Sequence, residues 1–393
     1  MSDIRTSAFL AHALVGLMLC GCGNDTGADD SGPGSSSTSD LSAGPTSEPE
    51  SSSTTQDTGP SPQSTTGTTG GGTATSDPDT GSSSESGDTG GLVDDGPVGW
   101  ASVAGRGVRT TTGGAAGRTV TVTTLDELEM YAGAEEPYVI QLSGTITGSV
   151  RVRSNKTLEG LPGAELVGGL AIIGEDDGFV SNIIVRDLTV RMDNCPGDGC
   201  SSDDAVTVYR AHHIWVDHCD ISDGDDGNLD ITAESDFVTV SWCRFSYSND
   251  SGGHRFSNLI GASDGATEDQ DDLAVTLHHN WWTANVSERM PRVRFGPVHV
   301  FNNYYTPTDA LYCMRAGFEA DLRIENNYFE GVSNPFDAGN TAPSAQVLAT
   351  GNEFSPMPIP EPDQGDVFDP PYAYSLDAAS DVPAVVMAGV GPR

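Results

Sequence analysis

Six segments in the second half of the chain share one pattern of apolar and polar positions. β-Branched and polar residues alternate up to a Cys or Asn, which is mostly followed by an aromatic or aliphatic residue. The segments are HIWVDHCDIS, FVTVSWCRFS, AVTLHHNWWT, VHVFNNYYTP, LRIENNYFEG and QVLATGNEFS. Strict alternation predicts short strands. A strand and a polar turn that recur about every two dozen residues, with almost no helix-period segment, predict an all-β solenoid, a parallel β-helix.

One position of this repeat predicts a ladder. It is occupied by Cys219, Cys243, Asn280, Asn303, Asn327 and Asn352, which are 24, 37, 23, 24 and 25 residues apart. Coils stacked at about 4.8 Å would bring like side chains together, so we expect the asparagine amides to bond along the stack. The two cysteines would be neighbours, either as packed thiols, which we favour, or as a disulfide.

The 37-residue step marks one coil with an insertion, SYSNDSGGHRFSNLIGASDGATEDQDD. Solenoids often place functional residues in such insertions. A β-sandwich or a propeller would also explain the alternation, but both folds need hairpin turns, and NG or DG pairs between the predicted strands are few.

The first quarter of the chain has a different composition. Residues 23–96 are rich in Ser, Thr, Gly, Pro and Asp, and no Lys or Arg lies between Cys22 and Arg106. Such a segment buries too little apolar surface to fold, so we predict a disordered linker, followed by the β-helix domain over residues 97–393.

Residues 1–22 have the pattern of an export signal, with one Arg, a short apolar run and a small-residue exit. Leu19-Cys20-Gly21-Cys22 resembles a lipobox, which predicts acylation at Cys22 and a secreted or outer-surface bacterial lipoprotein. An ordinary cleaved signal peptide is the alternative.

Export permits disulfides, and Cys195 and Cys200 could close a small loop. Membrane contact would occur only through the lipid anchor, and a solenoid of this kind is expected to be a monomer.

The charge balance narrows the choice of partner. The chain has 57 Asp and Glu residues against 18 Lys and Arg, a net charge of −39. This excess argues against a nucleic acid partner. An anionic substrate remains compatible where the site carries local positive charge or a cation.

Four charged residues are in phase with the repeat. Asp204, Asp226, Asp230 and Arg289 lie 13 to 17 residues before the next ladder position. If the coils stack, the three carboxylates converge on one face, with Arg289 about two coils further along. Three convergent carboxylates favour a hard cation such as calcium. The alternative is that the Asp residues of SDGDDGNLD are solvated turn formers.

The stretch VSERMPRVRFG places three arginines within six residues. Arg289 and Arg294 could bind a carboxylate, or they could pair with the surplus acids of the chain. For Arg292 we expect a salt bridge. No Ser-His-Asp pattern is present, and His278 and His279 lie in a repeat strand, which predicts a structural role.

Several motifs together resemble one known family. GWASVAGRGVRTTTGGAAGRTVTV, WVDHCDISDGDDGNLDI, VTVSWCRFS and VTLHHNWWTANVSERMPRVRFGPVHVFNNYY occur in the order seen in the pectate lyases of polysaccharide lyase family 1, over roughly Gly99 to Asn352. The resemblance implies a right-handed parallel β-helix. It also implies calcium-assisted β-elimination of polygalacturonate, the de-esterified form of pectin, to 4,5-unsaturated oligogalacturonates.

The resemblance also implies roles for single residues. Asp204, Asp226 and Asp230 match the calcium-binding aspartates of the family. Arg289, the first Arg of the RxPxxR motif, matches the catalytic base, and Arg294 matches the arginine that binds a substrate carboxylate. An arginine normally keeps its proton below about pH 12, so it is an unusual base.

Two departures from the family pattern concern binding residues. The first calcium segment reads Ser202-Asp203-Asp204 in place of a DxD pair, so one ligand is lost or is replaced by Asp203. The substrate-binding Lys before the LxG segment is absent, and we assign Arg255 as its replacement.

Three other activities would suit the same fold. A pectin lyase that acts on methylated polymer without calcium is expected to lack the aspartate cluster. A polygalacturonase-like hydrolase needs an acid and a base carboxylate in place of the arginines. A non-catalytic polysaccharide-binding β-helix should have lost Arg289.

Overall fold

The structure is a computed structural model that describes residues 96–175, 178–192, 204–248 and 254–393. The predictions for Cys22, for Cys195 with Cys200 and for Asp203 lie outside the described residues. Among the residues that are described, no helix is long and apolar enough to cross a membrane.

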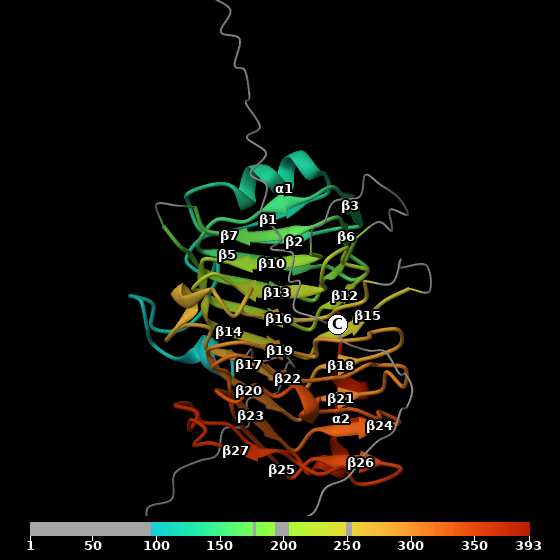
Figure 1. Cartoon of the computed structure of the whole chain (residues 1–393). Coiled ribbons are helices and arrows are strands. Elements are labelled where there is room, and N and C mark those ends of the chain that lie inside the picture. The colour runs from blue at the N-terminus through green and yellow to red at the C-terminus, as the bar shows by residue number, and fades with distance from the viewer. Residues whose placement is uncertain (1–95, 176–177, 193–203, 249–253) are drawn as a thin grey trace, which may run out of the picture. The chain divides into compact units, whose positions relative to one another are not determined.

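The described chain is built from three sheets of stacked, mostly parallel strands (Figure 1). An 11-stranded sheet contains β1 (Arg118–Val122), β2 (Tyr138–Leu142), β5 (Lys156–Gly160), β8 (Val180–Arg186), β11 (Ala211–Asp217), β14 (Asp236–Ser241), β17 (Val275–His278), β20 (Pro297–Phe301), β23 (Asp321–Glu325), β25 (Gln346–Thr350) and β27 (Asp363–Gln364). A 9-stranded sheet contains β3 (Thr145–Thr147), β6 (Glu165–Val167), β9 (Thr189–Arg191), β12 (Asp220–Ser222), β15 (Arg244–Ser246), β18 (Trp281–Trp282), β21 (Tyr304–Tyr305), β24 (Tyr328–Glu330) and β26 (Glu353–Ser355). A 7-stranded sheet contains β4 (Val150–Arg151), β7 (Leu170–Ile173), β10 (Val206–Tyr209), β13 (Leu229–Thr232), β16 (Leu259–Ile260), β19 (Arg292–Val293) and β22 (Arg315–Ala316).

The chain visits the three sheets in turn, and each strand pairs with the strands one coil before and after it. β11, for example, pairs in parallel with β8 and with β14. The last pairing, between β25 and β27, is antiparallel. This topology confirms the predicted parallel β-helix and is incompatible with a sandwich or a propeller, which are built from antiparallel neighbours.

The predicted asparagine ladder is present. The side-chain oxygen of Asn303 accepts the backbone N–H of Asn280 at 2.8 Å, and that of Asn327 accepts the N–H of Asn303 at 2.9 Å. Asn352 continues the series by accepting the N–H of Asn327 at 2.9 Å. Each amide therefore satisfies a turn donor of the preceding coil, which would otherwise be buried without a partner.

The cysteines of the ladder are free and buried, which confirms the packed-thiol interpretation. Aromatic rings stack next to the ladder inside the solenoid, with centroid distances of 5.3, 4.7, 4.6 and 5.3 Å between consecutive members. The stack contains Phe245, Trp282, Tyr305, Phe329 and Phe354. These rings come from successive strands of the 9-stranded sheet, and their offset stacking adds to the free energy gained by burial.

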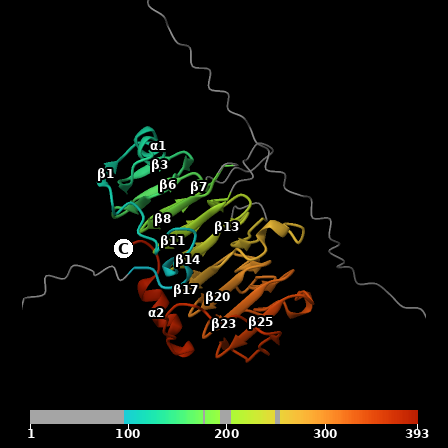
Figure 2. The same ribbon diagram turned by 90° about the vertical axis from the view of Figure 1, so that its left-hand side faces the viewer.

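Short helices lie outside the strand coils. α1 (Leu125–Ala132) lies beside β1 at the first end of the stack (Figures 1 and 2) and begins at Thr124, whose hydroxyl accepts the N–H of Glu127. α2 (Val382–Gly389) packs Val382 and Val386 against Tyr304 of β21. The remaining helical turns are η1 (Trp100–Ser102), η2 (Thr267–Asp269), η3 (Ala338–Asn340) and η4 (Ala379–Asp381).

Candidate active site

The charged residues in phase with the repeat lie at neighbouring strands of the 7-stranded sheet. Asp204 comes shortly before β10, Asp230 lies in β13, and Arg289 comes shortly before β19. Thr207 of β10 pairs with Asp230, and Leu259 of β16 pairs with Arg292 of β19. Because β16 lies between β13 and β19, Arg289 is two coils beyond Asp230, as the spacing predicts.

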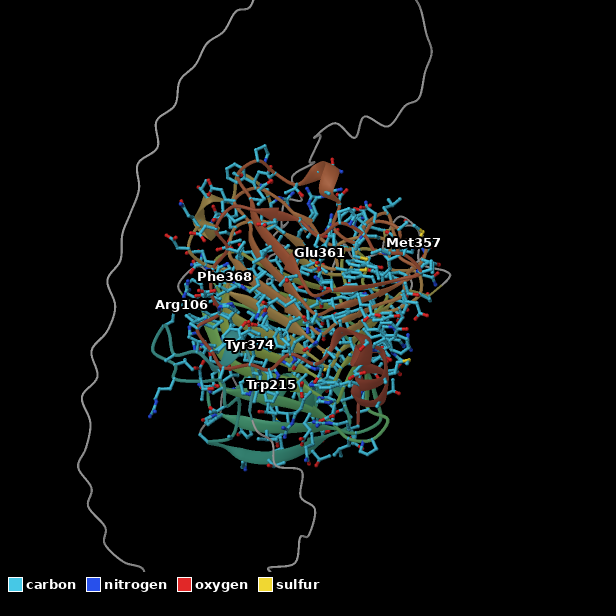
Figure 3. All side chains as sticks on the ribbon, turned by 90° about the horizontal axis from the view of Figure 1, so that it is seen from below. Arg106, Trp215, Met357, Glu361, Phe368 and Tyr374 are labelled. Carbon is cyan, nitrogen blue, oxygen red and sulfur yellow. The ribbon has the colours of Figure 1, made fainter. Side chains whose placement is uncertain are left out.

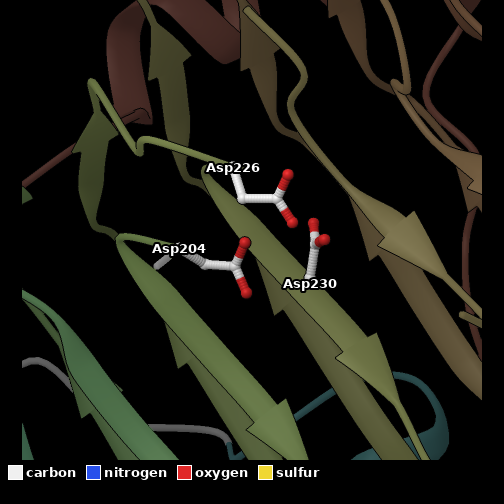
Figure 4. A group of neighbouring side chains, drawn as sticks. All are labelled: Asp204, Asp226 and Asp230. Atoms are coloured by element: carbon white, nitrogen blue, oxygen red, sulfur yellow. The ribbon is translucent and has the colours of Figure 1, made fainter. Parts of the chain in front are cut away.

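The three aspartates form one cluster. Each of Asp204, Asp226 and Asp230 offers an oxygen, and these oxygens all lie within 4.8 Å of one another. Figure 4 shows the three carboxylates pointing toward one another. The Thr207 hydroxyl donates to Asp204 Oδ2 at 3.1 Å, and the Leu259 N–H donates to Asp230 Oδ1 at 2.9 Å, so two members are held in place by fixed donors.

The electrostatics of the cluster are unfavourable without a cation. Burial raises the pKa of Asp230 to about 7, the positive charge of Arg289 opposes this rise, and the charge of Asp226 adds to it. The pKa of Asp226 is lowered, chiefly by its hydrogen bond with His254, whose Nε2 lies 3.1 Å from Asp226 Oδ1. A buried carboxylate beside two others is costly to ionise unless a positive charge is close.

The donor set fits a calcium ion. All three ligands offered are carboxylate oxygens, which hard cations such as Ca²⁺ prefer, and one of them is buried. Gly227 is part of this fit, because a Cβ there would lie 2.6 Å from Asp230 Oδ1 and 3.1 Å from Asp204 Oδ1. A side chain at position 227 would therefore displace the carboxylates from one another.

Arg289 is held by its backbone and by an aromatic ring. Its φ of 60° is left-handed, a conformation that non-glycine residues adopt at a cost and that is enriched at functional sites. Its carbonyl oxygen accepts the N–H of Asn258 at 2.5 Å, and its guanidinium carbon lies 4.2 Å from the centre of the Phe256 ring. Among the residues that the structure describes, Arg289 has no carboxylate within ion-pair distance, and its enclosed Nε has no hydrogen-bond partner.

The other two predicted binding arginines are engaged with the protein. Arg294 is 3% exposed; its Nε donates to Asp264 at 2.6 Å and its Nη1 to the carbonyls of Gly261 and Ala262, each at 3.1 Å. Arg255 lies 3.4 Å from Asp309, an exposed carboxylate. The structure thus places Arg294 under the inserted coil and Arg255 at its surface, and their substrate-binding roles stay predictions.

The salt bridge predicted for Arg292 is not present among the residues that the structure describes. No carboxylate within the described ranges lies in ion-pair distance of its guanidinium group, and its enclosed Nε has no hydrogen-bond partner there. The backbone explains the difference. Arg292 precedes the fully buried Val293 in β19, and alternation along a strand directs its side chain to the outward face, where the register neighbours are Leu259 and Arg315.

Sequence reasoning missed Phe256 and His254, which contact Arg289 and Asp226 respectively. Their rings also pack on each other, with centroids 4.1 Å apart. The 37-residue step between Cys243 and Asn280 did point to this segment as an inserted coil. It could not show which of its side chains reach the site, because the insertion has no counterpart in the repeat.

Two hollows lie elsewhere, over the 11-stranded sheet, with volumes of about 500 and 420 Å³. Trp215 and Tyr374, labelled in Figure 3, line the first and the second respectively. In the first, the carboxylate of Asp217 already contacts His218 at 2.6 Å and the Ser241 hydroxyl at 2.5 Å. His278 of β17 lines both hollows and is 6% exposed, and its Nδ1 lies 2.9 Å from Nδ1 of His279. These internal pairings favour the aspartate cluster as the reactive site.

A parallel β-helix that carries, on one sheet, a carboxylate cluster and an arginine without an ion pair among the described residues is compatible with the polysaccharide lyase class. Sequence comparison identifies the family. The family model described as "Pectate lyase" matches residues 91–355. The chain belongs to the pectate lyase family.

Curated relatives agree with this assignment. A pectate trisaccharide-lyase of Thermotoga sp. is 34% identical over 348 residues, which cover 76% of this chain and 89% of the relative. One of Bacillus licheniformis is 33% identical, covering 72% and 83%. The match to the enzyme of Thermotoga maritima reaches 39% identity but covers 54% of this chain and only 58% of that protein.

Solved structures share the fold. A pectate lyase bound to a hexasaccharide superposes with a TM-score of 0.63 at 22% identity, covering 75% of this chain and 96% of the other. A thermostable pectate lyase gives a TM-score of 0.61 at 24% identity, covering 77% and 97%. The parallel β-helix is therefore common to these proteins despite low sequence identity.

Proposed function

We propose that this protein cleaves polygalacturonate by calcium-assisted β-elimination, with Asp204, Asp226 and Asp230 as metal ligands and Arg289 as the base. One observation carries the proposal: three carboxylates converge, one of them, Asp230, lies close enough to Arg289 for the arginine's charge to affect its pKa, and Arg289 has no ion-pair partner among the described residues. The names of the relatives, pectate trisaccharide-lyases, support the same substrate.

The chemistry assigns each group a task. Calcium, when bound to the cluster, would neutralise a substrate carboxylate and so make the adjacent C5 proton more acidic. Arg289 would take that proton. The electron pair of the C5–H bond would form the C4=C5 double bond, and the O4 bond would break, with the leaving oxygen taking a proton from water. The product is a 4,5-unsaturated uronide at the new end of the chain.

The surroundings of Arg289 position the proposed base. No described carboxylate forms an ion pair with its guanidinium group, so no described acid draws the group away from a substrate. Phe256 and the backbone of Asn258 fix where the guanidinium lies. Positioning of this kind lets a base act without reorganising at the moment of reaction.

The proposal includes export. Support comes from the apolar run and lipobox-like Leu19-Cys20-Gly21-Cys22, which would anchor the enzyme at an outer cell surface through an acylated Cys22. A long Ser/Thr/Gly-rich linker after this cysteine would let the catalytic domain reach an extended polymer. Mass spectrometry of the protein made in a bacterial host tests the anchor, because acylation adds a lipid mass to a chain that begins at Cys22.

The decisive test of the activity is the chemistry of the product. The full chain is incubated with calcium and either polygalacturonate or highly methylated pectin, and unsaturated product is followed by absorbance. We expect unsaturated product mainly from polygalacturonate. New reducing ends without the unsaturated group would indicate a hydrolase, preference for methylated polymer would indicate a pectin lyase, and binding without cleavage would indicate a carbohydrate-binding protein. Separating the products by length shows whether trisaccharides accumulate.

A further inference from the structure

Arg292 occupies an outward position on the sheet that carries the aspartate cluster. Register pairs place Thr207, Asp230, Leu259, Arg292 and Arg315 in one column across successive strands, from β10 to β22. Adjacent strands are about 4.8 Å apart, so Arg292 stands roughly 10 Å from Asp230 along the direction in which the coils stack.

Among the described residues, no acidic side chain forms an ion pair with the guanidinium group of Arg292. Arg315, its neighbour in the column, is ion-paired with Asp337, and Arg151, at the far end of the same sheet, pairs with Glu175. Arg292 has no such partner among the residues described, although acids outnumber bases 57 to 18 in the chain. Acidic side chains are therefore abundant in the chain, but none of the described ones lies within ion-pair distance of Arg292.

The setting of Arg292 is also unfavourable for a positive charge. Burial lowers its pKa, and the neighbouring charges of Arg294, Arg315 and Arg289 lower it further. An unpaired, half-buried charge among like charges costs stability, so we infer that the group has a partner other than the described residues of the chain.

We propose that Arg292 binds a carboxylate of the galacturonate polymer, one that belongs to a different sugar from the carboxylate neutralised at the aspartate cluster. The inference rests on the proposed function, because it takes its ligand to be the same polymer. A guanidinium group matches a carboxylate with two parallel hydrogen bonds, and a polymer with one carboxylate per sugar offers further carboxylates beyond the reacting one. Arg292 would thereby make the site select a de-esterified stretch.

The test compares binding of a defined galacturonate oligomer with binding of the same oligomer after methyl esterification. We expect the wild type to prefer the free acid, and Arg292→Gln to weaken binding of the free acid about tenfold while leaving the ester nearly unchanged. Arg292→Lys should be intermediate, since lysine keeps the charge but loses the two-pronged geometry. Arg151→Gln is the matched control, because Arg151 lies on the same sheet and already has a carboxylate partner.

Stability and steady-state kinetics separate binding from a structural role. Arg292→Gln should keep or raise the melting temperature, because it removes an unpaired charge, and should raise KM for polygalacturonate about tenfold with kcat nearly unchanged. Equal binding of the free acid by wild type and Arg292→Gln would overturn the inference, as would an equal loss in Arg151→Gln. A wild type that binds the oligomer without eliminating it would overturn the proposed reaction and leave the binding comparison valid.

Discussion

The guanidinium group of Arg289 lies 4.2 Å from the centre of the Phe256 ring. The two residues come from adjacent coils, since Phe256 forms a parallel bridge with Glu288. A cation on an aromatic face is attracted to it, and the ring also bars other groups from that side. The inserted coil thus supplies the support on which the predicted base rests.

Replacing Phe256 by Leu should lower kcat on polygalacturonate about tenfold, because the guanidinium would lose its fixed position while the aspartates stay in place. Phe256→Tyr keeps the ring and should retain most of the activity. Initial rates at saturating polymer, with melting temperatures for both variants, check this. Full activity in Phe256→Leu would show that the ring does not position Arg289.

Arg289→Lys should abolish turnover while leaving the fold intact, because lysine cannot reproduce the position of the guanidinium nitrogens. Unsaturated product is again the readout, and a circular dichroism spectrum like that of the wild type provides the control. Normal turnover in this variant would remove Arg289 as the base.

Asn303 should be one of the most important polar residues for stability. Its side chain accepts from Asn280 twice, at 2.8 and 3.1 Å, and donates to the carbonyls of Leu277 and Phe301 at 2.9 and 3.0 Å. Asn303→Leu would leave several buried groups unpaired and should lower the free energy of unfolding by about 3–5 kcal/mol in urea titrations. Asn352→Leu, at the partly exposed end of the ladder, should lower the free energy of unfolding by less. An equal loss in both variants would contradict the importance of burial for the hydrogen bonds of Asn303.

Asp236 should make stability depend on pH. Burial raises its pKa to about 6, although it accepts the N–H of Ala274 at 3.0 Å. Because this folded-state pKa is above the unfolded value, the contribution of Asp236 to stability is complete below about pH 4 and is lost as pH rises through about 6. Asp236→Asn cannot ionise, so relative to the wild type it should gain about 1–3 kcal/mol between pH 4.5 and pH 7.5.

Urea unfolding of both proteins over this pH range measures the difference directly. Asp369→Asn is the control for the substitution itself, because the Asp369 side chain is 98% exposed. A pH-independent difference between Asp236→Asn and the wild type would contradict the effect of burial on Asp236.

The coil architecture could be predicted from the sequence because a solenoid repeats its contacts. The positions of Asn280, Asn303 and Asn327 fix where each coil turns, and the same spacing brought Asp204 and Asp230 to one cluster. Each coil contacts mainly its neighbours, so the alternation within a strand and the constant period between strands are enough to predict which residues of successive coils lie side by side.

Contacts that break the repeat could not be predicted in the same way. Phe256 reaches Arg289 from the inserted coil, and Arg294 is covered by Asp264 of the same insertion. The missing ion pair of Arg292 depends on which side of β19 it faces and on the absence of described acids near it, and neither follows from an arginine-rich stretch alone. Nothing in the period of the coil fixes these side-chain contacts.

The most direct test of the account is the dependence of elimination on a cation held by the aspartate cluster. The rate at which wild-type enzyme forms unsaturated product from polygalacturonate is measured after chelation and again after calcium is restored, with Asp230→Asn in parallel. We predict that product formation stops in the chelator and recovers with calcium, and that Asp230→Asn stays inactive or needs much more calcium. Elimination that continues at an undiminished rate in the chelator would contradict the proposed mechanism.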